Sequence, residues 1–361
     1  MLAGPGEMPA CKRRDDMQTT IATRMEETSM AKSHAKFHAT LAVLVGGALA
    51  AGVCVTAHGQ SYPTRSIELV SPTSAGSGTD IYARTLAEIV RQNKFLPQQF
   101  VVQNRTGGGS LVAYNYFQTK RGDPYVMLAA TGTIAIMAAR ADVNIGLENY
   151  TPLALFAVDP QAVMVGADTP YKTLKDLAEA ARKQPDTIVC AITNPLGSGR
   201  MVIHELEKLA PGAKFKFVTF KGGGEAILSV AGGHTQFTTE NLSEGLALLE
   251  AKKIRALAIT SLKRMPQLPD LPTATEAGYK IDEGTIRGFV FPVGVPKETA
   301  TMMENVLERA YNTQAWKDHA RKYYYEDRYL GSAEYLKFLH QRVEKYKTFF
   351  VEVGANPKPA Q

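Results

Sequence analysis

The sequence predicts an α/β fold, because short apolar runs alternate with amphipathic segments along most of the chain. This alternation is typical of parallel sheets with crossover helices. The apolar runs predict strands at 66–71, 99–103, 125–131, 152–157, 162–166, 187–192, 215–219, 255–260 and 287–291. Helical spacing predicts helices near 80–93, 108–119, 172–183, 200–209, 223–231 and 242–251. After Pro296 we expect helices alone, near 297–312, 314–322 and 332–352.

The first small-residue loop lies between the apolar run at 67–70 and the helix expected near 80–93. The loop and its cap consist of Ser74, Ala75, Gly76, Ser77, Gly78, Thr79 and Asp80. Thr79 and Asp80 are both good N-caps. A helix that starts here has unpaired backbone N–H groups at the positive end of its dipole, which suits an anion. The alternative is a tight connection that binds nothing.

This loop lacks the pattern of a nucleotide-binding site. Ile81 stands where the dinucleotide fingerprint needs its third glycine after Gly76 and Gly78. No G-x-x-x-x-G-K-[ST] motif occurs anywhere in the chain. We therefore expect an anion site that is not built for pyrophosphate.

Three further small-residue loops follow predicted strands. Their notable residues are Thr131 and Gly132 in one loop, Asn194, Gly197, Ser198 and Arg200 in the next, and Lys221 beside three glycines in the last. In open α/β sheets, ligands bind at the carboxyl ends of the strands. Loops of one kind at that edge therefore predict a shared ligand site.

Residues 1–59 are predicted to be an N-terminal extension and a secretory signal peptide. Lys32 and Lys36 precede an uncharged run from 39 to 57, and the small residues of Ala57-His58-Gly59 end it. This order is typical of a cleaved signal and predicts a periplasmic location. A transmembrane anchor is the alternative, because the uncharged run is nearly long enough to span a bilayer.

Composition excludes several classes of partner. The 361-residue chain carries a net charge of +6 with scattered basic residues, which does not favour nucleic acid. Cys190 is the only cysteine beyond the predicted signal, so we expect a buried, inert thiol and no internal disulfide. The histidines of the same region are isolated from one another, so no metal site and no cofactor are predicted. We expect a monomer with two domains.

From Tyr62 to Val353 the chain resembles the substrate-binding proteins of tripartite tricarboxylate transporters, the TctC or Bug family of periplasmic receptors. The resemblance is carried by motifs in a fixed order: Tyr62-Pro63-Thr64-Arg65, Ala75-Gly76-Ser77-Gly78-Thr79-Asp80, Asn104-Arg105-Thr106-Gly107-Gly108-Gly109, Phe220-Lys221-Gly222, Ile254-Arg255-Ala256-Leu257-Ala258, Pro269-Asp270-Leu271-Pro272-Thr273, Glu276-Ala277-Gly278 and Pro292-Val293-Gly294-Val295-Pro296. Each motif is weak by itself, and the series is specific.

The resemblance implies a two-lobed periplasmic-binding-protein fold (type II, Venus flytrap) with C-terminal helices. Lobe 1 is expected to hold 60–158 plus 284–361, and lobe 2 to hold 159–283. Such a receptor closes on a small carboxylate between its lobes and delivers it to a membrane permease, without catalysis. From the loops and the resemblance together, the expected ligand-binding residues are Ser74, Gly76, Ser77, Gly78, Thr79, Asp80, Thr131, Gly132, Asn194, Gly197, Ser198, Arg200 and Lys221.

The chain departs from the family pattern at positions that bear on the ligand. Arg200 and Ile203 stand where the family commonly has Ser and His, Phe220 replaces a Tyr, and Ile286 replaces a Trp. A cation in the first turn of a helix opposes the dipole, and an anion bound there would remove the conflict. Arg200 is therefore predicted to hold the ligand carboxylate with two bonds. The alternative is an Arg200 that reaches solvent or pairs with a nearby acid.

Two rival functions remain open from the residues. A secreted α/β hydrolase would need a G-x-S-x-G elbow, which is absent, although Asp80 with His204 or His234 could form an acid–base site. A receptor that signals its closed state to a sensor is indistinguishable by sequence from one that serves uptake.

Overall fold

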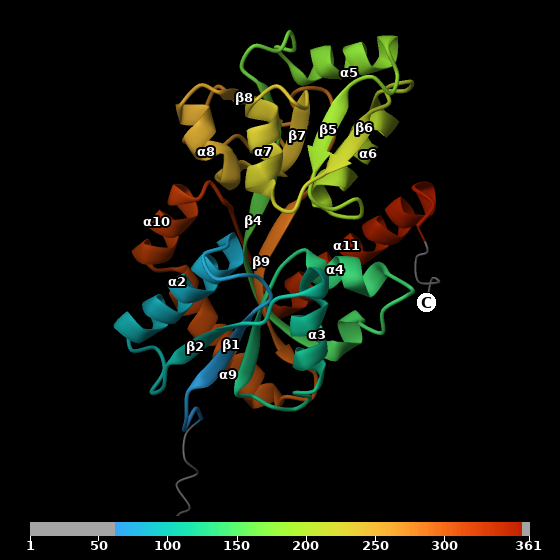
Figure 1. The fold of residues 1–361 in the computed structure, drawn as a ribbon. Coiled ribbons are helices and arrows are strands. Elements are labelled where there is room, and N and C mark those ends of the chain that lie inside the picture. The colour runs from blue at the N-terminus through green and yellow to red at the C-terminus, as the bar shows by residue number, and fades with distance from the viewer. Residues whose placement is uncertain (1–61, 356–361) are drawn as a thin grey trace, which may run out of the picture. The chain divides into compact units, whose positions relative to one another are not determined.

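The computed structural model describes residues 62–355, so the predicted signal peptide lies outside the described residues. Within this range ten strands form one mixed sheet (Figure 1). The strands are β1 (Ile67–Ser71), β2 (Phe100–Asn104), β3 (Val126–Ala130), β4 (Tyr150–Gly166), β5 (Val189–Ile192), β6 (Lys216–Thr219), β7 (Phe237–Asn241), β8 (Ile254–Ile259), β9 (Gly284–Pro292) and β10 (Glu326–Gly331). The predicted α/β class is confirmed, but the sheet contains antiparallel as well as parallel pairs.

Helices alternate with these strands. The α-helices are α2 (Gly78–Gln92), α3 (Leu111–Gln118), α4 (Thr133–Ala139), α5 (Leu174–Lys183), α6 (Ser198–Leu209), α7 (Gly223–Ala231), α8 (Leu242–Glu250), α9 (Lys297–Tyr311), α10 (Gln314–Lys322) and α11 (Ser332–Glu352), and the short 3-10 helices are η1 (Gly108–Ser110) and η2 (Leu147–Asn149). Among the described residues, no helix is both long and apolar enough to cross a membrane.

β4 is the strand that the two parts of the sheet share. From Tyr150 to Pro160 it pairs antiparallel with β9, and β10 pairs with it as well. From Gln161 to Gly166 it pairs with β7 and β8 instead. Figure 1 shows β4 and β9 running from one group of elements into the other. We call β1–β3, β9, β10 and their helices the first half, and β5–β8 and their helices the second half; the division into two lobes stays a prediction.

Helices cover both faces of each half, which is why most strands read as continuous apolar runs. In the first half, one core lies under α2, α9 and α10 around Trp316, whose ring contacts Tyr82 and Phe156. The other core of this half lies under α3, α4 and α11. In the second half, α5 and α6 cover one core, and α7 and α8 cover the other.

Four parts of the element prediction are wrong. The runs at 152–157 and 162–166 form one strand, because Pro160 lies where the partners of β4 change instead of ending the strand. β7 and β10 were missed because their sequences, FTTEN and EDRYLG, are polar. β10 also interrupts the C-terminal region that was expected to be all helical. α4 was missed because it is uniformly apolar and so has no helical period.

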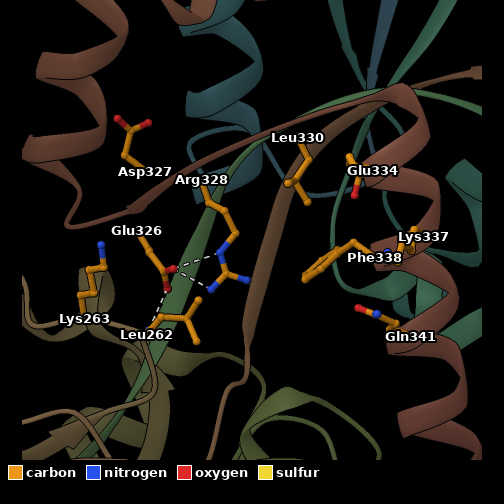
Figure 2. A pocket seen from close by; sticks show the side chains of 10 residues that line it. All are labelled: Leu262, Lys263, Glu326, Asp327, Arg328, Leu330, Glu334, Lys337, Phe338 and Gln341. Atoms are coloured by element: carbon orange, nitrogen blue, oxygen red, sulfur yellow. Dashed lines mark hydrogen bonds and ion pairs between the residues drawn. The ribbon is translucent and has the colours of Figure 1, made fainter.

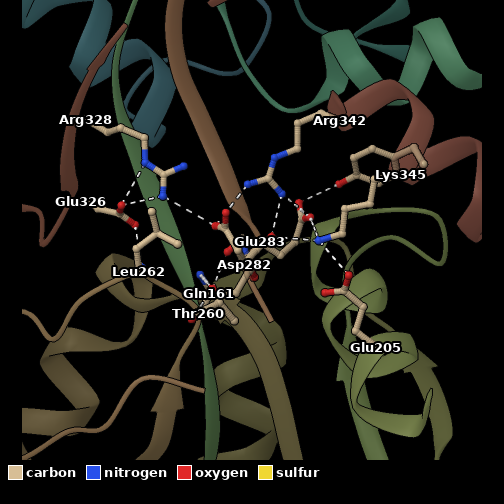
Figure 3. A network of polar contacts seen from close by, with 11 residues as sticks. Gln161, Glu205, Thr260, Leu262, Asp282, Glu283, Glu326, Arg328, Arg342 and Lys345 are labelled. Carbon is tan, nitrogen blue, oxygen red and sulfur yellow. Dashed lines mark hydrogen bonds and ion pairs between the residues drawn. The ribbon is translucent and has the colours of Figure 1, made fainter. Parts of the chain in front are cut away.

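α11 joins the two halves through ion pairs (Figure 3). Arg342 pairs with Asp282 and Glu283, which directly precede β9. Lys345 lies 3.1 Å from Glu283 and 2.8 Å from Glu205 of α6. We call these five residues the α11 clamp. On its apolar side, α11 buries the expected stripe except at Leu336, which is 37% exposed.

Candidate functional site

The loop after β1 is held in shape by its own side chains. Ser77, rather than Thr79 or Asp80, is the N-cap of α2, and its hydroxyl accepts from the Asp80 N–H. The Asp80 carboxylate accepts from the N–H of Gly76 at 2.9 Å, from Arg84 at 3.0 Å and from Asn104 at 2.8 Å. Burial opposes ionisation of Asp80, but these hydrogen bonds lower its pKa below the usual value. Ser77 and Asp80 therefore build the loop, while Ser74 at its tip is exposed.

Two backbone donors of this loop stay available. The N–H groups of Gly78 and Thr79 make no hydrogen bond to any residue that the structure describes. Both lie in the first turn of α2, at the positive end of its dipole. This part of the loop fits the predicted anion site.

Arg287 of β9 lies directly against this loop. Its Nη1 donates to the Thr79 hydroxyl at 3.0 Å, and its Nη2 donates to the Asp159 carboxylate at 2.6 Å. A Cβ atom at Gly78 would lie 2.9 Å from Nη2. Gly78 is therefore needed for the approach of Arg287, a reason that the sequence analysis did not anticipate.

Two further carboxylates lie beyond Asp159. A Cβ atom at Gly223, the first residue of α7, would lie 2.2 Å from a Glu244 oxygen and 3.2 Å from a Glu240 oxygen. Glu240 of β7 is 7% exposed, and Glu244 in the first turn of α8 is exposed. Burial, and then the charge of Glu244, raise the pKa of Glu240 to about 8. Burial and Asp159 raise the pKa of Glu244, which Arg287 opposes.

These residues connect the loops that the sequence singled out. We define the polar junction as Gly78, Thr79, Asp159, Gly223, Glu240, Glu244 and Arg287. It starts at the first loop, passes the Phe220–Glu225 loop at Gly223, and reaches the Asn194 loop where Glu240 bonds Thr193. The structure therefore brings three predicted loops together on one set of charged side chains.

Those charged side chains are not among the site residues that the sequence predicts. Arg287 had one available signal, because a charge inside an apolar strand must find a partner when it is buried. Asp159 carried the same signal beside Pro160. Glu240 lies in a polar strand that gave no sign of burial, so only the three-dimensional fold reveals it.

Two helices that face this region begin with glycine caps. Gly197 precedes α6 and Gly222 precedes α7, and neither end has a side-chain cap. The backbone N–H groups of their first turns therefore lack a capping acceptor, which favours an anion there. Ser198 accepts from the Gln161 amide at 3.3 Å.

The remaining predicted residues have local roles in the described structure. The Asn194 carboxamide accepts from the Leu196 N–H at 2.9 Å and shapes the second loop. Thr131 accepts from the Thr133 N–H at 3.3 Å, and Gly132 is the N-cap of α4. The Lys221 side chain is exposed.

Arg200 has its nearest partners within the second half, and its guanidinium also lies 6.0 Å from the ring of Phe349 in α11. Its guanidinium lies 4.3 Å from the ring of Phe217 and 3.7 Å from the Glu207 carboxylate. Its Nη1 is buried and has no hydrogen-bond partner in residues 62–355. Burial lowers the pKa of Arg200. The structure does not bring Arg200 into contact with the first loop, so its ligand role stays a prediction.

A separate pocket lies between β10, α11 and the segment after β8 (Figure 2). Its central charges are already paired, since Arg328 donates to Glu326 at 2.6 Å and the Leu262 N–H also bonds Glu326. None of the predicted site residues lines it. In the described residues, no group of His, Cys, Asp and Glu could hold a metal ion. The polar junction is thus the better candidate site.

Comparisons with known proteins agree with this fold. A model of the tripartite tricarboxylate transporter family receptor matches residues 82–355. BugT of Bordetella pertussis is 28% identical over 266 residues, which cover 73% of this chain and 80% of BugT. A TctC solute-binding protein from Polaromonas, solved without ligand, is 25% identical, with a TM-score of 0.70 over 81% of this chain and 100% of that one. An R. palustris protein solved with adipate is 24% identical, with a TM-score of 0.72 over 82% and 100%. The predicted receptor fold is confirmed.

Proposed function

This chain belongs to the tripartite tricarboxylate transporter receptor family, and from that premise we propose that it captures a small carboxylate in the periplasm and delivers it to a membrane permease. The family is one of solute-binding receptors. The observation that carries the proposal is the polar junction, where backbone donors and a buried arginine meet three small-residue loops.

The ligand carboxylate is proposed to bind the free N–H groups of Gly78 and Thr79. Arg287 supports this position, because its charge lies within hydrogen-bond distance of Thr79. The uncapped starts of α6 and α7 supply further donors from the second half, at Ser198 and Gly223. Charge-assisted bonds from backbone N–H groups are among the stronger ones in proteins.

The two lobes, 60–158 plus 284–361 and 159–283, are proposed to close on the ligand about β4 and β9. These strands run through both halves, and the partners of β4 change at Pro160. Closure would exclude water and strengthen each hydrogen bond to the ligand. The predicted signal peptide would direct the chain to the periplasm, where it would act as a monomer.

A thermal-shift screen of small carboxylates tests the proposal. Adipate, malate, succinate and benzoate form a first panel, and a ligand at 100 times its Kd should stabilise the protein by about 2.7 kcal/mol. Calorimetry would then measure the Kd, and mass spectrometry should recover the ligand unchanged. A chemically altered ligand would favour the enzyme alternative, and a panel without any stabilising anion would count against a carboxylate receptor.

A further inference from the structure

Starting from the proposed function, we infer that the ligand carries a positively charged nitrogen as well as a carboxylate, and that Glu240 and Glu244 receive this nitrogen. The ligand class is thus the amino acids and related zwitterions, rather than simple di- or tricarboxylates. The inference rests on the position and the unpaired state of these two carboxylates, and on the burial of Glu240.

The two carboxylates converge on one glycine. Glu240 comes from β7 and Glu244 from α8, and a Cβ atom at Gly223 would approach an oxygen of each. A side chain at residue 223 would clash with the Glu244 carboxylate, so the glycine allows this close approach. Gly223 also begins α7, whose first turn has no side-chain cap. Acidic oxygens and uncapped backbone donors therefore lie side by side at Gly223.

Neither carboxylate has a cationic partner in the described structure. No ion pair within residues 62–355 includes Glu240 or Glu244. Arg287 is committed to Asp159 at 2.6 Å, and the exposed Lys221 in the neighbouring loop pairs with neither glutamate. A carboxylate as buried as that of Glu240 is costly to ionise unless a cation accompanies it. A ligand ammonium group would supply that cation.

The other end of the junction offers donors. Arg287 is 4% exposed, and its Nε has no hydrogen-bond partner among residues 62–355. The free N–H groups of Gly78 and Thr79 lie beside the same guanidinium. Asp159 separates these donors from the two glutamates, since Arg287 bonds it and its charge acts on Glu244. A ligand with a carboxylate and an ammonium group matches donors at one end and acceptors at the other.

Helix chemistry alone does not explain the pair. An acid in the first turn of α8 interacts favourably with the helix dipole, which accounts for Glu244. Glu240 lies at the end of a strand and is more than nine-tenths buried, so the dipole of α8 does not account for it. Thr193 is its hydrogen-bond partner, and a hydroxyl does not neutralise a charge.

Proton release gives the inference a second readout. The titratable groups that act on Glu240 are Glu244 and the Cys190 thiol, and Asp159 and Arg287 act in turn on Glu244. With its pKa raised to about 8, Glu240 is mostly protonated at pH 7. A bound cation would lower that pKa, so binding should release up to about one proton. Calorimetry in two buffers with different ionisation enthalpies measures this release.

The test compares ligands that differ only by an amino group. Calorimetry at pH 7 with succinate and aspartate, glutarate and glutamate, and adipate and 2-aminoadipate should show the amino member of the best pair binding about tenfold tighter or more. Proton release should accompany only that member. If a diacid binds equally well or better and releases no proton, the inference is overturned and the carboxylate receptor stands. If no member of any pair binds, the proposed function fails with it.

Variants locate the effect. Glu240→Gln and Glu244→Gln should each remove most of the preference for the amino member, and Glu240→Gln should also abolish proton release. Glu250→Gln, an exposed change at the other end of α8, is the control and should keep both. Circular dichroism and melting temperature check folding. A preference that survives in both site variants would overturn the assignment of these residues.

Discussion

Two polar clusters lie where the halves of the sheet meet, and they differ in how their charges are matched. In the α11 clamp, Glu283, Asp282 and Glu205 each have a cation within ion-pair distance (Figure 3). In the polar junction, Asp159 has Arg287 and the other two acids have none. Removing one partner from a matched buried pair strands the other charge, whereas acids without a cation raise the free energy of the empty protein and favour a ligand that completes them. The difference separates a structural contact from a candidate binding site.

Breaking the matched cluster should have the largest effect. Arg342→Met leaves Glu283, which is 1% exposed, with Lys345 as its remaining cation. We expect a loss of about 3 kcal/mol in the free energy of unfolding, because the loss of one partner strands a buried charge. Urea unfolding measures it. Arg264→Met, which breaks an exposed pair with Glu276, is the control and should cost less than about 1 kcal/mol. Equal losses would mean that the α11 clamp contributes no more to stability than an exposed ion pair.

The stability of the first half should fall in acid, because His319 lies near Arg287. Burial, Arg287 and Lys322 lower the pKa of His319 to about 4. The unfolded chain then binds the proton more readily, so this stability is present above about pH 6.5 and is lost as the pH falls toward 4. In His319→Gln, the free energy of unfolding should fall less in acid than in the wild type, by up to about 3 kcal/mol. Urea unfolding at several pH values measures this difference. The same change at the exposed His340 should leave the profile as it is.

Crowding the junction should weaken binding without removing a charge. Gly78→Val places a side chain against Nη2 of Arg287 and displaces the guanidinium from Thr79. We expect a ten- to hundredfold rise in Kd, or about 1.4–2.7 kcal/mol. Gly331→Ala, whose Cβ would meet nothing within 4 Å, is the matched control. An unchanged Kd for Gly78→Val would remove the first loop from the site.

Arg200 is expected to have the smallest effect of the four. Its Nη1, which has no hydrogen-bond partner among residues 62–355, can still donate to a ligand carboxylate, although Phe217 and Glu207 hold the group. Arg200→Ala should weaken binding about tenfold, and Arg200→Lys should recover part of this, because an ammonium group makes no paired planar contact. Equal Kd values for all three proteins would limit Arg200 to its packing role.

Local pattern explains what the sequence could predict. The helical face of α2 and the loop before it were predicted because both depend on neighbouring residues. Even there the N-cap is Ser77 instead of Thr79 or Asp80. The Asp80 carboxylate instead accepts hydrogen bonds from Gly76, Arg84 and Asn104. Cys190 is buried and free, as expected. The fold as a whole was predicted from the family motifs, because local patterns do not determine how the elements are arranged.

The charged centre of the site could not be predicted in the same way. Arg287 and Asp159 are 128 residues apart in the chain, and no local period links them. Glu240 and Glu244 meet at Gly223 only because β7, α8 and α7 pack together. β7 was itself missed, because its polar residues are buried by neighbours distant in sequence. Such contacts depend on the order of strands, which the apolar pattern does not contain.

The path of the chain through β4 has a consequence for biosynthesis. The first half needs β9, β10 and the buried Trp316, all of which follow the complete second half in the sequence. While the ribosome adds residues at about 5–20 per second, the N-terminal strands therefore wait for partners that emerge last. Until then their apolar faces are exposed and no stable first half exists. For a chain that is expected to be exported, this delay keeps the first half unfolded for most of its synthesis. An unfolded chain can pass through a translocation channel.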